Sequence, residues 1–196
     1  MRGTSVQSTH TMQLVWPSEQ YLPGYVAALK RGWSADNIRA EAGAREDLEK
    51  IAKDPAHFLA GLVDREATGG PVTLPDGSSV PRLPGYRRWL WDGEFCGSIG
   101  LRWQPGSSAL PDYCLGHIGY SVVPWKQGKG YATLALRLLL PEARAEGLTY
   151  VELITDPSNI ASQRVIQANG GVLVERFVEP AQYGGAEALR FRIDLR

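Results

Sequence analysis

The chain has 196 residues, of which 21 are Lys or Arg and 21 are Asp or Glu, so its formal net charge is zero. This length suits one soluble domain with a sizeable core, and the neutral balance argues against a nucleic acid or an anionic membrane as main partner, because both need a broad basic surface. Only two cysteines are present, and the longest apolar stretch, residues 134–140, contains Arg137 and is far shorter than a membrane span. We therefore expect a cytoplasmic protein without a disulfide framework.

The chain divides into a short leader and one domain with two halves. Residues 1–12 are polar and lack the apolar core of a secretion signal, which predicts a disordered leader before a single domain over 13–196. All six tryptophans lie at or before residue 125, ahead of Gly128 and Gly130. This uneven distribution indicates that residues 13–114 and 115–196 have different roles.

The first half opens with short elements. An apolar run over 14–16 predicts a strand, and apolar residues at helical spacing over 21–29 predict a helix. Asp54, which is followed by proline, is typical of a helix start, because aspartate accepts from the exposed N–H groups of the first turn. We expect that helix to run to about Val63. The stretch 65–85 is rich in glycine and proline and predicts a long connection.

From residue 86 the apolar residues alternate, which predicts strands. Asp92 and Gly93 form a two-residue turn between a strand that holds Trp89 and a returning strand that ends near Trp103, so we expect an antiparallel hairpin. The later elements follow the same reasoning from periodicity and turn residues. They are a strand over 115–123, a helix over 131–146, a strand over 150–155, a helix over 159–169, and strands over 172–177 and 189–195. The order is mixed α/β, with a central sheet flanked by helices.

The glycine-rich segment 122–133 carries the chemistry. A strand enters, Pro124 ends it, Gly128 and Gly130 allow close backbone approach, and a helix begins at once. Several N–H groups would then point to one spot in front of the positive end of the helix dipole, which favours a phosphate or pyrophosphate ligand.

Three phosphate motifs compete for these residues. The P-loop fails because Gly130 stands where Ser or Thr is required, and the dinucleotide fingerprint is met at Gly128 and Gly130 but has Thr133 at its third position. The third motif fits: Gln127-x-x-Gly130-x-Ala132 at a strand-to-helix junction resembles the acyl-CoA pyrophosphate motif of the GNAT superfamily of N-acetyltransferases. A second segment, residues 159–162 followed by a helix that closes at 170–171, is similar to the next strand-and-helix motif of that family.

The resemblance implies a mostly antiparallel, splayed mixed sheet flanked by helices, with acetyl-CoA as acyl donor and no metal. Residues 115–196 would bind acetyl-CoA and residues 13–114 the acceptor. The backbone of Val122 and Val123 would pair with the pantetheine arm, and Asn159 would bond it from the far side. The cofactor-binding set that the resemblance implies comprises Val122, Val123, Gln127, Gly128, Lys129, Gly130, Tyr131, Ala132, Thr133, Asn159 and Ser162.

The acid and the base of the reaction are harder to assign. Many family members carry a tyrosine that protonates the leaving thiolate, but Ile166 stands at the matching position, so Ser162 is the candidate acid, with Ser121 or a water as alternatives. An acceptor amine is mostly protonated at neutral pH and must lose a proton. The candidates for the base, from the two strands that border the proposed gap, are His117, Glu152 and Asp156. Trp33 and Trp103 are candidates for lining the acceptor pocket.

These observations predict an N-acetyltransferase that transfers acetyl directly to a primary amine in a ternary complex. The amine could belong to a small molecule, a peptide or a protein, and exposed sheet edges would allow a homodimer. Two alternatives remain open: a non-catalytic acyl-CoA-binding or sensor module, and an NAD(P)-linked oxidoreductase. Cys114 and His117 lack two further ligands at suitable spacing, so no metal site is expected.

Overall fold

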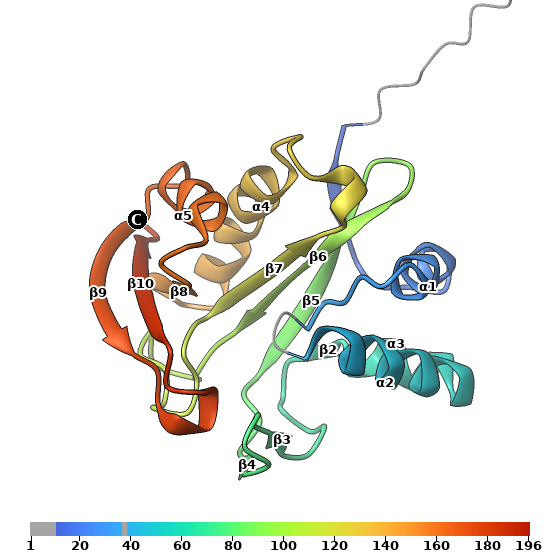
Figure 1. Ribbon diagram of the computed structural model, residues 1–196, viewed down its shortest axis with the longest axis horizontal. Helices are drawn as coiled ribbons and strands as arrows, with labels where there is room; N and C mark the ends of the chain where they lie inside the picture. The colour runs from blue at the N-terminus through green and yellow to red at the C-terminus, as the bar shows by residue number, and fades with distance from the viewer. Residues whose placement is uncertain (1–10, 37–38) are drawn as a thin grey trace, which may run out of the picture.

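A computed structural model describes residues 11–36 and 39–196 of the chain (Figure 1). Residues 1–10 of the predicted leader lie outside the described residues. Met12, the last residue assigned to the leader, is 3% exposed and packs in the main core. The ordered domain therefore takes in at least this one residue of the predicted leader.

The larger sheet is antiparallel throughout and has the order β1-β5-β6-β7, with β2 also paired to β5. Its strands are β1 (Gln13–Val15), β2 (Val63–Asp64), β5 (Gly85–Trp91), β6 (Phe95–Arg102) and β7 (Ile118–Val122). The turn between β5 and β6 holds Asp92 and Gly93, which confirms the predicted hairpin.

A second, smaller sheet has the order β8-β10-β9 and is also antiparallel. Its strands are β8 (Tyr150–Thr155), β9 (Val172–Val178) and β10 (Glu187–Asp194). The two sheets meet where the His117 N–H donates to the Glu152 carbonyl oxygen at 2.8 Å, and β7 and β8 diverge beyond this point (Figure 1). The predicted fold class, a splayed and mostly antiparallel sheet flanked by helices, is thus confirmed.

Helices cover both faces of the larger sheet (Figure 1). One face carries α1 (Leu22–Lys30), α2 (Ala40–Lys53) and α3 (Pro55–Gly61), whereas α4 (Tyr131–Ala145) packs on the other face and α5 (Ile160–Gln167) lies beside it. The Asp54 carboxylate accepts from the His57 N–H at 2.9 Å and starts α3 as predicted. The sequence did not predict α2, whose buried residues, Gly43 and Ala44, are small.

The connection predicted over 65–85 contains the small hairpin of β3 (Val72–Thr73) and β4 (Ser79–Val80). Two short 3-10 helices complete the chain, η1 (Pro124–Lys126) before α4 and η2 (Ala181–Tyr183) between β9 and β10. Among the described residues, no helix has the length and apolarity that a membrane crossing requires. Strand β9 ends the smaller sheet and exposes Val172 and Val178, while the predicted homodimer stays a prediction.

The core has two parts, one on each face of the larger sheet. Between the sheet and α4 lie fully buried aliphatic residues such as Ile99, Leu136 and Leu139. Between the sheet and α1 to α3 lies an aromatic group in which Tyr25 stacks on Trp89 at 4.8 Å between ring centroids. The sheet is therefore held from both sides, which fixes the position of its last strand, β7.

Gly97 on β6 is a constraint on the pairing with β7. Its φ is +152°, and a Cβ there would lie 2.3 Å from the Ser121 carbonyl oxygen and 2.9 Å from the Val122 Cα. The register of β5 and β6 shifts between Leu90 and Trp91, beside this residue. Only glycine allows β7 to lie this close at the bulge.

We expect Gly97→Ala to lower the free energy of unfolding by at least about 2 kcal/mol, because the new methyl group would push β7 away from β6. Gly100→Ala on the same strand is the control, since its Cβ would meet no atom closer than 3.5 Å. Urea unfolding of both variants tests this. Equal stability of the two variants would contradict the proposed constraint.

Candidate functional site

A cavity of about 850 Å³ opens where β7 and β8 diverge. Its walls come from β7, the loop before α4, the start of α4, the end of β8 and one face of α5. This volume suits a bound organic ligand. Of the predicted cofactor-binding residues, those that line the cavity are Val122, Gln127, Gly128, Gly130, Tyr131, Ala132, Thr133, Asn159 and Ser162.

The loop before α4 presents a row of backbone donors. Gly128 and Gly130 have φ of +74° and +76°, a left-handed conformation that glycine adopts freely, and a Cβ at either would meet no atom within 4 Å. In the described part of the chain, no backbone acceptor takes the N–H groups of residues 128–133. The Gln127 N–H instead makes a long bond of 3.4 Å to the Pro124 carbonyl oxygen. The row is therefore free to bind an anion at the positive end of α4.

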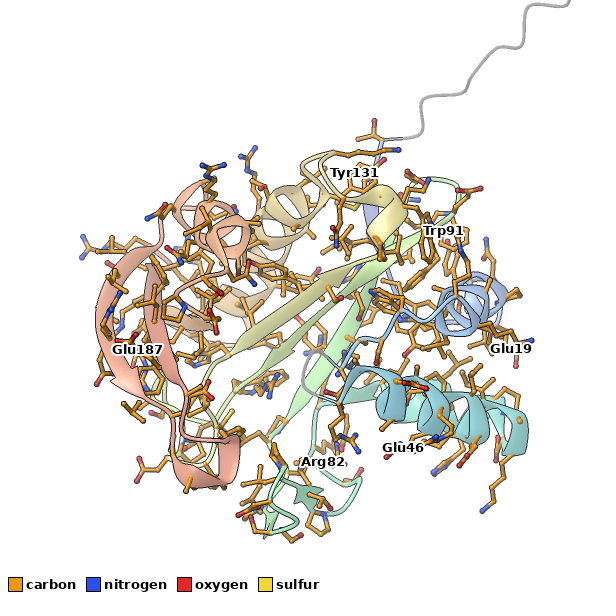
Figure 2. The ribbon with its side chains drawn as sticks, in the orientation of Figure 1. Glu19, Glu46, Arg82, Trp91, Tyr131 and Glu187 are labelled. Carbon is orange, nitrogen blue, oxygen red and sulfur yellow. The ribbon has the colours of Figure 1, made fainter. Side chains whose placement is uncertain are left out.

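The side chains around this loop hold it in place. The Lys126 ammonium lies 3.0 Å from the Asp92 carboxylate and 3.0 Å from that of Glu94, and the Tyr131 hydroxyl donates to Asp92 at 2.5 Å. Burial alone would raise the pKa of Asp92, but the bonds from Tyr131 and Lys126 hold it at about 2. Asp92 is thus ionised and ties the β5–β6 turn to both ends of the loop. Figure 2 shows Tyr131 beside this turn.

Lysine side chains offer little free positive charge to a ligand at this loop. The Lys126 ammonium is engaged by two carboxylates, so it neutralises them and is not free for a ligand anion. Lys129 is exposed and does not line the cavity. The backbone donors, and not lysine charge, therefore make this an anion site.

The edge of β7 that faces the cavity offers backbone groups. The Val123 N–H donates to the Cys96 carbonyl oxygen at 2.9 Å and the Arg102 N–H donates to the His117 carbonyl oxygen at 2.9 Å, both within the larger sheet. Because antiparallel pairing alternates, Tyr120 and Val122 direct their N–H and C=O groups away from β6. Val123 is fully buried and its N–H is used, so the prediction that Val123 pairs with a ligand is wrong, whereas Val122 faces the cavity.

The start of α5 forms the opposite wall. The Asn159 Oδ1 accepts from the Ser162 N–H at 3.0 Å and caps the helix, so part of this amide has a structural role. The Ser162 hydroxyl lies 2.9 Å from the Tyr120 hydroxyl, which reaches across from β7. Burial raises the pKa of Tyr120, so this phenol stays protonated. Sequence analysis missed Tyr120, whose only signal was its place on the strand that precedes the glycine-rich loop.

The candidate bases do not gather at the cavity. His117 is fully buried, its Nδ1 accepts from the Glu152 N–H at 2.9 Å, and burial lowers its pKa to about 4. The Glu152 carboxylate pairs with Arg192 at 2.6 Å. Neither residue lines the cavity, so both predictions are corrected to structural roles. Asp156 does line it, but bonds from Ser158 lower the pKa of its carboxyl and make it a weak base.

The two tryptophans predicted for the acceptor pocket are core residues. Trp33 is 5% exposed and its Nε1 donates to the Ser121 hydroxyl at 2.9 Å, which also engages the serine considered as an alternative acid. Trp103 is 7% exposed and packs edge-on against Tyr86. Neither lines the larger cavity or the second cavity described below, so their contact with an acceptor stays a prediction.

A second cavity, of about 500 Å³, lies on the side of the larger sheet that α1 to α3 cover. It is lined by residues of β5 and β6, the β3–β4 hairpin and the loop before β7. Gly119 on β7 lines both cavities. A ligand in each could therefore approach the other across the edge of this strand.

Residues 78–172, nearly half of the chain, match the family model for the acetyltransferase (GNAT) domain. The chain contains a GNAT acetyltransferase domain. Both sequence motifs that predicted this domain lie within the matched range. No sequence among the curated proteins matches this GNAT chain significantly.

Solved GNAT structures share the fold over nearly their whole length. The microcin C7 self-immunity acetyltransferase MccE, solved with acetyl-CoA and AMP, is 13% identical at a TM-score of 0.62, with 98% of this chain and 96% of that one covered. The ribosomal L7/L12 α-N-protein acetyltransferase RimL, solved with coenzyme A, is 14% identical at 0.62, with 96% of each chain covered. A spermidine N-acetyltransferase SpeG chimera that includes Vibrio cholerae sequence is 15% identical at 0.61, with 94% and 95% covered. Identities this low show the fold alone.

The His117 imidazole generates a pH prediction for this GNAT domain. Its pKa is about 4 in the fold and about 6.5 when unfolded, so the unfolded chain binds a proton first as pH falls. The contribution of the neutral imidazole to the free energy of unfolding is therefore fully present above about pH 6.5 and decreases as the pH falls toward 4. When the pH is lowered from about 7 to about 5, the free energy of unfolding of the native protein should decrease by about 1–2 kcal/mol more than that of His117→Gln.

Urea unfolding at the two pH values measures this difference. His57→Gln is the matched control, since His57 is exposed on α3, and it should keep the pH dependence of the native protein. A His117→Gln variant with an unchanged slope would show that the imidazole is not held neutral by burial.

Proposed function

We propose that this protein is an acetyl-CoA-dependent N-acetyltransferase that transfers the acetyl group directly to a primary amine. One observation carries the proposal: in the described part of the chain the N–H groups of residues 128–133 have no backbone acceptor, and every residue of this run except Lys129 lines the larger cavity, beside the edge of β7 that faces away from β6. The GNAT domain and the acetyl-CoA or coenzyme A in solved structures of this fold support the same ligand.

The residues present fit that ligand. The backbone donors after Gly128 would hold the pyrophosphate, where left-handed glycines leave space on the ligand side. The outward groups of Tyr120 and Val122 would pair with the amides of the pantetheine arm as a strand edge does. The Gln127 amide, which donates to the Val122 carbonyl oxygen at 3.2 Å, would move or share that acceptor when the arm binds.

Acetyl-CoA supplies an activated acetyl thioester. The amine nitrogen attacks the carbonyl carbon, the carbon–sulfur bond breaks, and its electron pair leaves with the sulfur. The Val122 N–H would stabilise the carbonyl oxygen as it gains negative charge. A proton from the Ser162 or Tyr120 hydroxyl would neutralise the departing thiolate, and the hydroxyl pair would regain it from solvent.

The amine must lose protons during the reaction, and none of the candidate bases is suited to accept them. Burial lowers the pKa of His117 to about 4, and bonds from Ser158 lower that of Asp156. Water is therefore the proposed proton acceptor. Burial also raises the pKa of the Cys96 thiol to about 12, which disfavours a covalent acetyl intermediate on Cys96.

The hydroxyl pair also bears on the alternative of a non-catalytic sensor. That alternative rested on Ile166 at the position of the expected tyrosine and on the lack of a convincing base. Tyr120 brings a phenol to the cavity from another element, which bears on the first of these two grounds only. The GNAT domain gives no support to an NAD(P)-linked oxidoreductase. The amine acceptor and a cytoplasmic location are parts of the same proposal.

Gly130→Asp should raise the dissociation constant of acetyl-CoA at least about 100-fold, because it places a carboxylate at the proposed pyrophosphate site. Gly147→Asp is the matched control: Gly147 is also left-handed, at φ +88°, and its Cβ would also meet no atom within 4 Å, but it follows the far end of α4. Calorimetric titration of both variants tests the site. Equal affinities would exclude the loop as the acetyl-CoA site.

Ser162→Ala and Tyr120→Phe should each lower kcat about 10- to 100-fold while changing the affinity for acetyl-CoA less than about threefold. The double variant should be no slower than the worse single variant if the two hydroxyls act as one proton donor. Release of free thiol from acetyl-CoA with an amine panel measures turnover. Full-rate single variants would remove the hydroxyl pair from the mechanism, and binding without turnover on any amine would favour the sensor.

A further inference from the structure

We infer that the second cavity is the acceptor site and that it selects an amine which also carries a carboxylate or phosphate group. This inference rests on the proposed function. The sequence predicted two tryptophans for the acceptor pocket, but the charged residues that line this cavity are mostly arginines. They are Arg39, Arg82, Arg87 and Arg102, against two carboxylates, Asp36 and Asp64. For a chain of zero net charge, this is a local surplus of positive charge.

Two of the arginines are already engaged. Arg39 pairs with Asp36 at 2.9 Å and with Glu46 at 2.8 Å. Arg82 donates to the Gly70 carbonyl oxygen at 2.8 Å and lies 3.7 Å from Asp64. Figure 2 shows Arg82 at the end of the molecule away from Tyr131. These two arginines therefore neutralise the two acids of the cavity and shape its outer wall.

Arg87 and Arg102 are different, because across residues 11–36 and 39–196 neither side chain forms an ion pair or a hydrogen bond. Both project from the same face of the larger sheet, since Arg87 is paired with Gly100, two residues before Arg102 on β6. Two guanidinium groups without a counter-ion in one cavity form a binding site for a planar or tetrahedral anion.

Glycines bring this charge to the edge of β7. Arg87, Gly100 and Gly119 are paired across the three strands. A Cβ on Gly100 would lie 3.5 Å from the Arg87 Cγ, and a Cβ on Gly119 would lie 3.7 Å from an Arg102 guanidinium nitrogen. Because Gly100 and Gly119 have no side chains, both arginines lie over the bare backbone of the sheet, which forms the floor of the cavity. Gly119 also lines the larger cavity, so the anion site adjoins the place where the acetyl group would be transferred.

Two tyrosines, Tyr113 and Tyr183, form another part of the cavity wall. Tyr183, from η2, donates its hydroxyl to the Tyr113 carbonyl oxygen and so joins the β9–β10 connection to the loop before β7. Both tyrosines line the cavity. A small amine with an acidic group, or the end of a peptide that carries one, would be held between the tyrosines and the two arginines.

The test is calorimetric binding of matched ligand pairs to the protein saturated with coenzyme A. One series compares amino acids and acidic dipeptides with their carboxamides, and a second compares phosphoethanolamine with ethanolamine. At least one acid should bind about tenfold or more tightly than its neutral partner, as expected for a charge-assisted bond. The series that shows this preference identifies the anion as carboxylate or phosphate.

Arg87→Gln and Arg102→Gln should each reduce this preference to less than about threefold and leave the affinity for acetyl-CoA unchanged. Arg102→Lys should retain part of the preference, because it keeps the charge. Arg137→Gln is the control, since Arg137 is exposed on α4 and lines neither cavity. Matching melting temperatures would show that the variants are folded.

The outcomes separate this inference from the proposed function. If no acid binds more tightly than its neutral partner, or if the preference survives both Arg→Gln changes, the inference is wrong, even where neutral amines are acetylated. If the preference depends on the arginines but no amine is acetylated, the proposed catalysis is wrong and the anion site stands.

Discussion

The separation of β7 from β8 is the constraint on which the rest of the structure depends. The two strands are joined at the His117 N–H and the Glu152 carbonyl oxygen, and a Cβ at Gly116 would already lie 3.2 Å from that same oxygen. Beyond this contact the edge of β7 that faces away from β6 borders the larger cavity instead of pairing with β8. In the proposed function, a ligand with amides along its length would pair with this edge, and the cavity has the volume to hold one.

The loop before α4 is held in place by side-chain bonds that do not involve a ligand. Asp92 comes from a hairpin turn more than thirty residues earlier in the chain, yet it bonds both Lys126 and Tyr131, at either end of the loop. These bonds keep the carboxylate ionised and fix the start of α4 against the larger sheet. The backbone donors of residues 128–133 are thus aimed in advance, which lowers the conformational entropy that binding would cost. Lys126, the charged side chain that bonds Asp92, has a structural role, and the proposed donors to a ligand are main-chain N–H groups.

The strand β7 separates two cavities of different character. Toward α4 and α5 it presents Tyr120 and Val122 to a site built from backbone donors and hydroxyls, and toward α1 to α3 it presents Gly119 to a site bordered by arginines. This alternation follows from the period of two along a strand, so one short element borders both cavities from its two faces. In the proposed direct transfer the two reactants would meet at the edge of this strand, where Gly119 lines both cavities.

The sequence by itself determined the order of elements after residue 86, the fold class, the family and the glycine-rich anion loop, because these depend on local periodicity, turn residues and motif spacing. It missed α2, whose fully buried residues are the small Gly43 and Ala44. Its candidates for the base were His117, Glu152 and Asp156, but His117 is buried, Glu152 pairs with Arg192, and only Asp156 lines the larger cavity. Only the tertiary structure decided which of Val122 and Val123 faces the ligand, that Tyr120 meets Ser162 across the cavity, and that Arg87 and Arg102 share one sheet face. Those facts depend on register and on contacts between distant segments, and no pattern within a short window of sequence carries them.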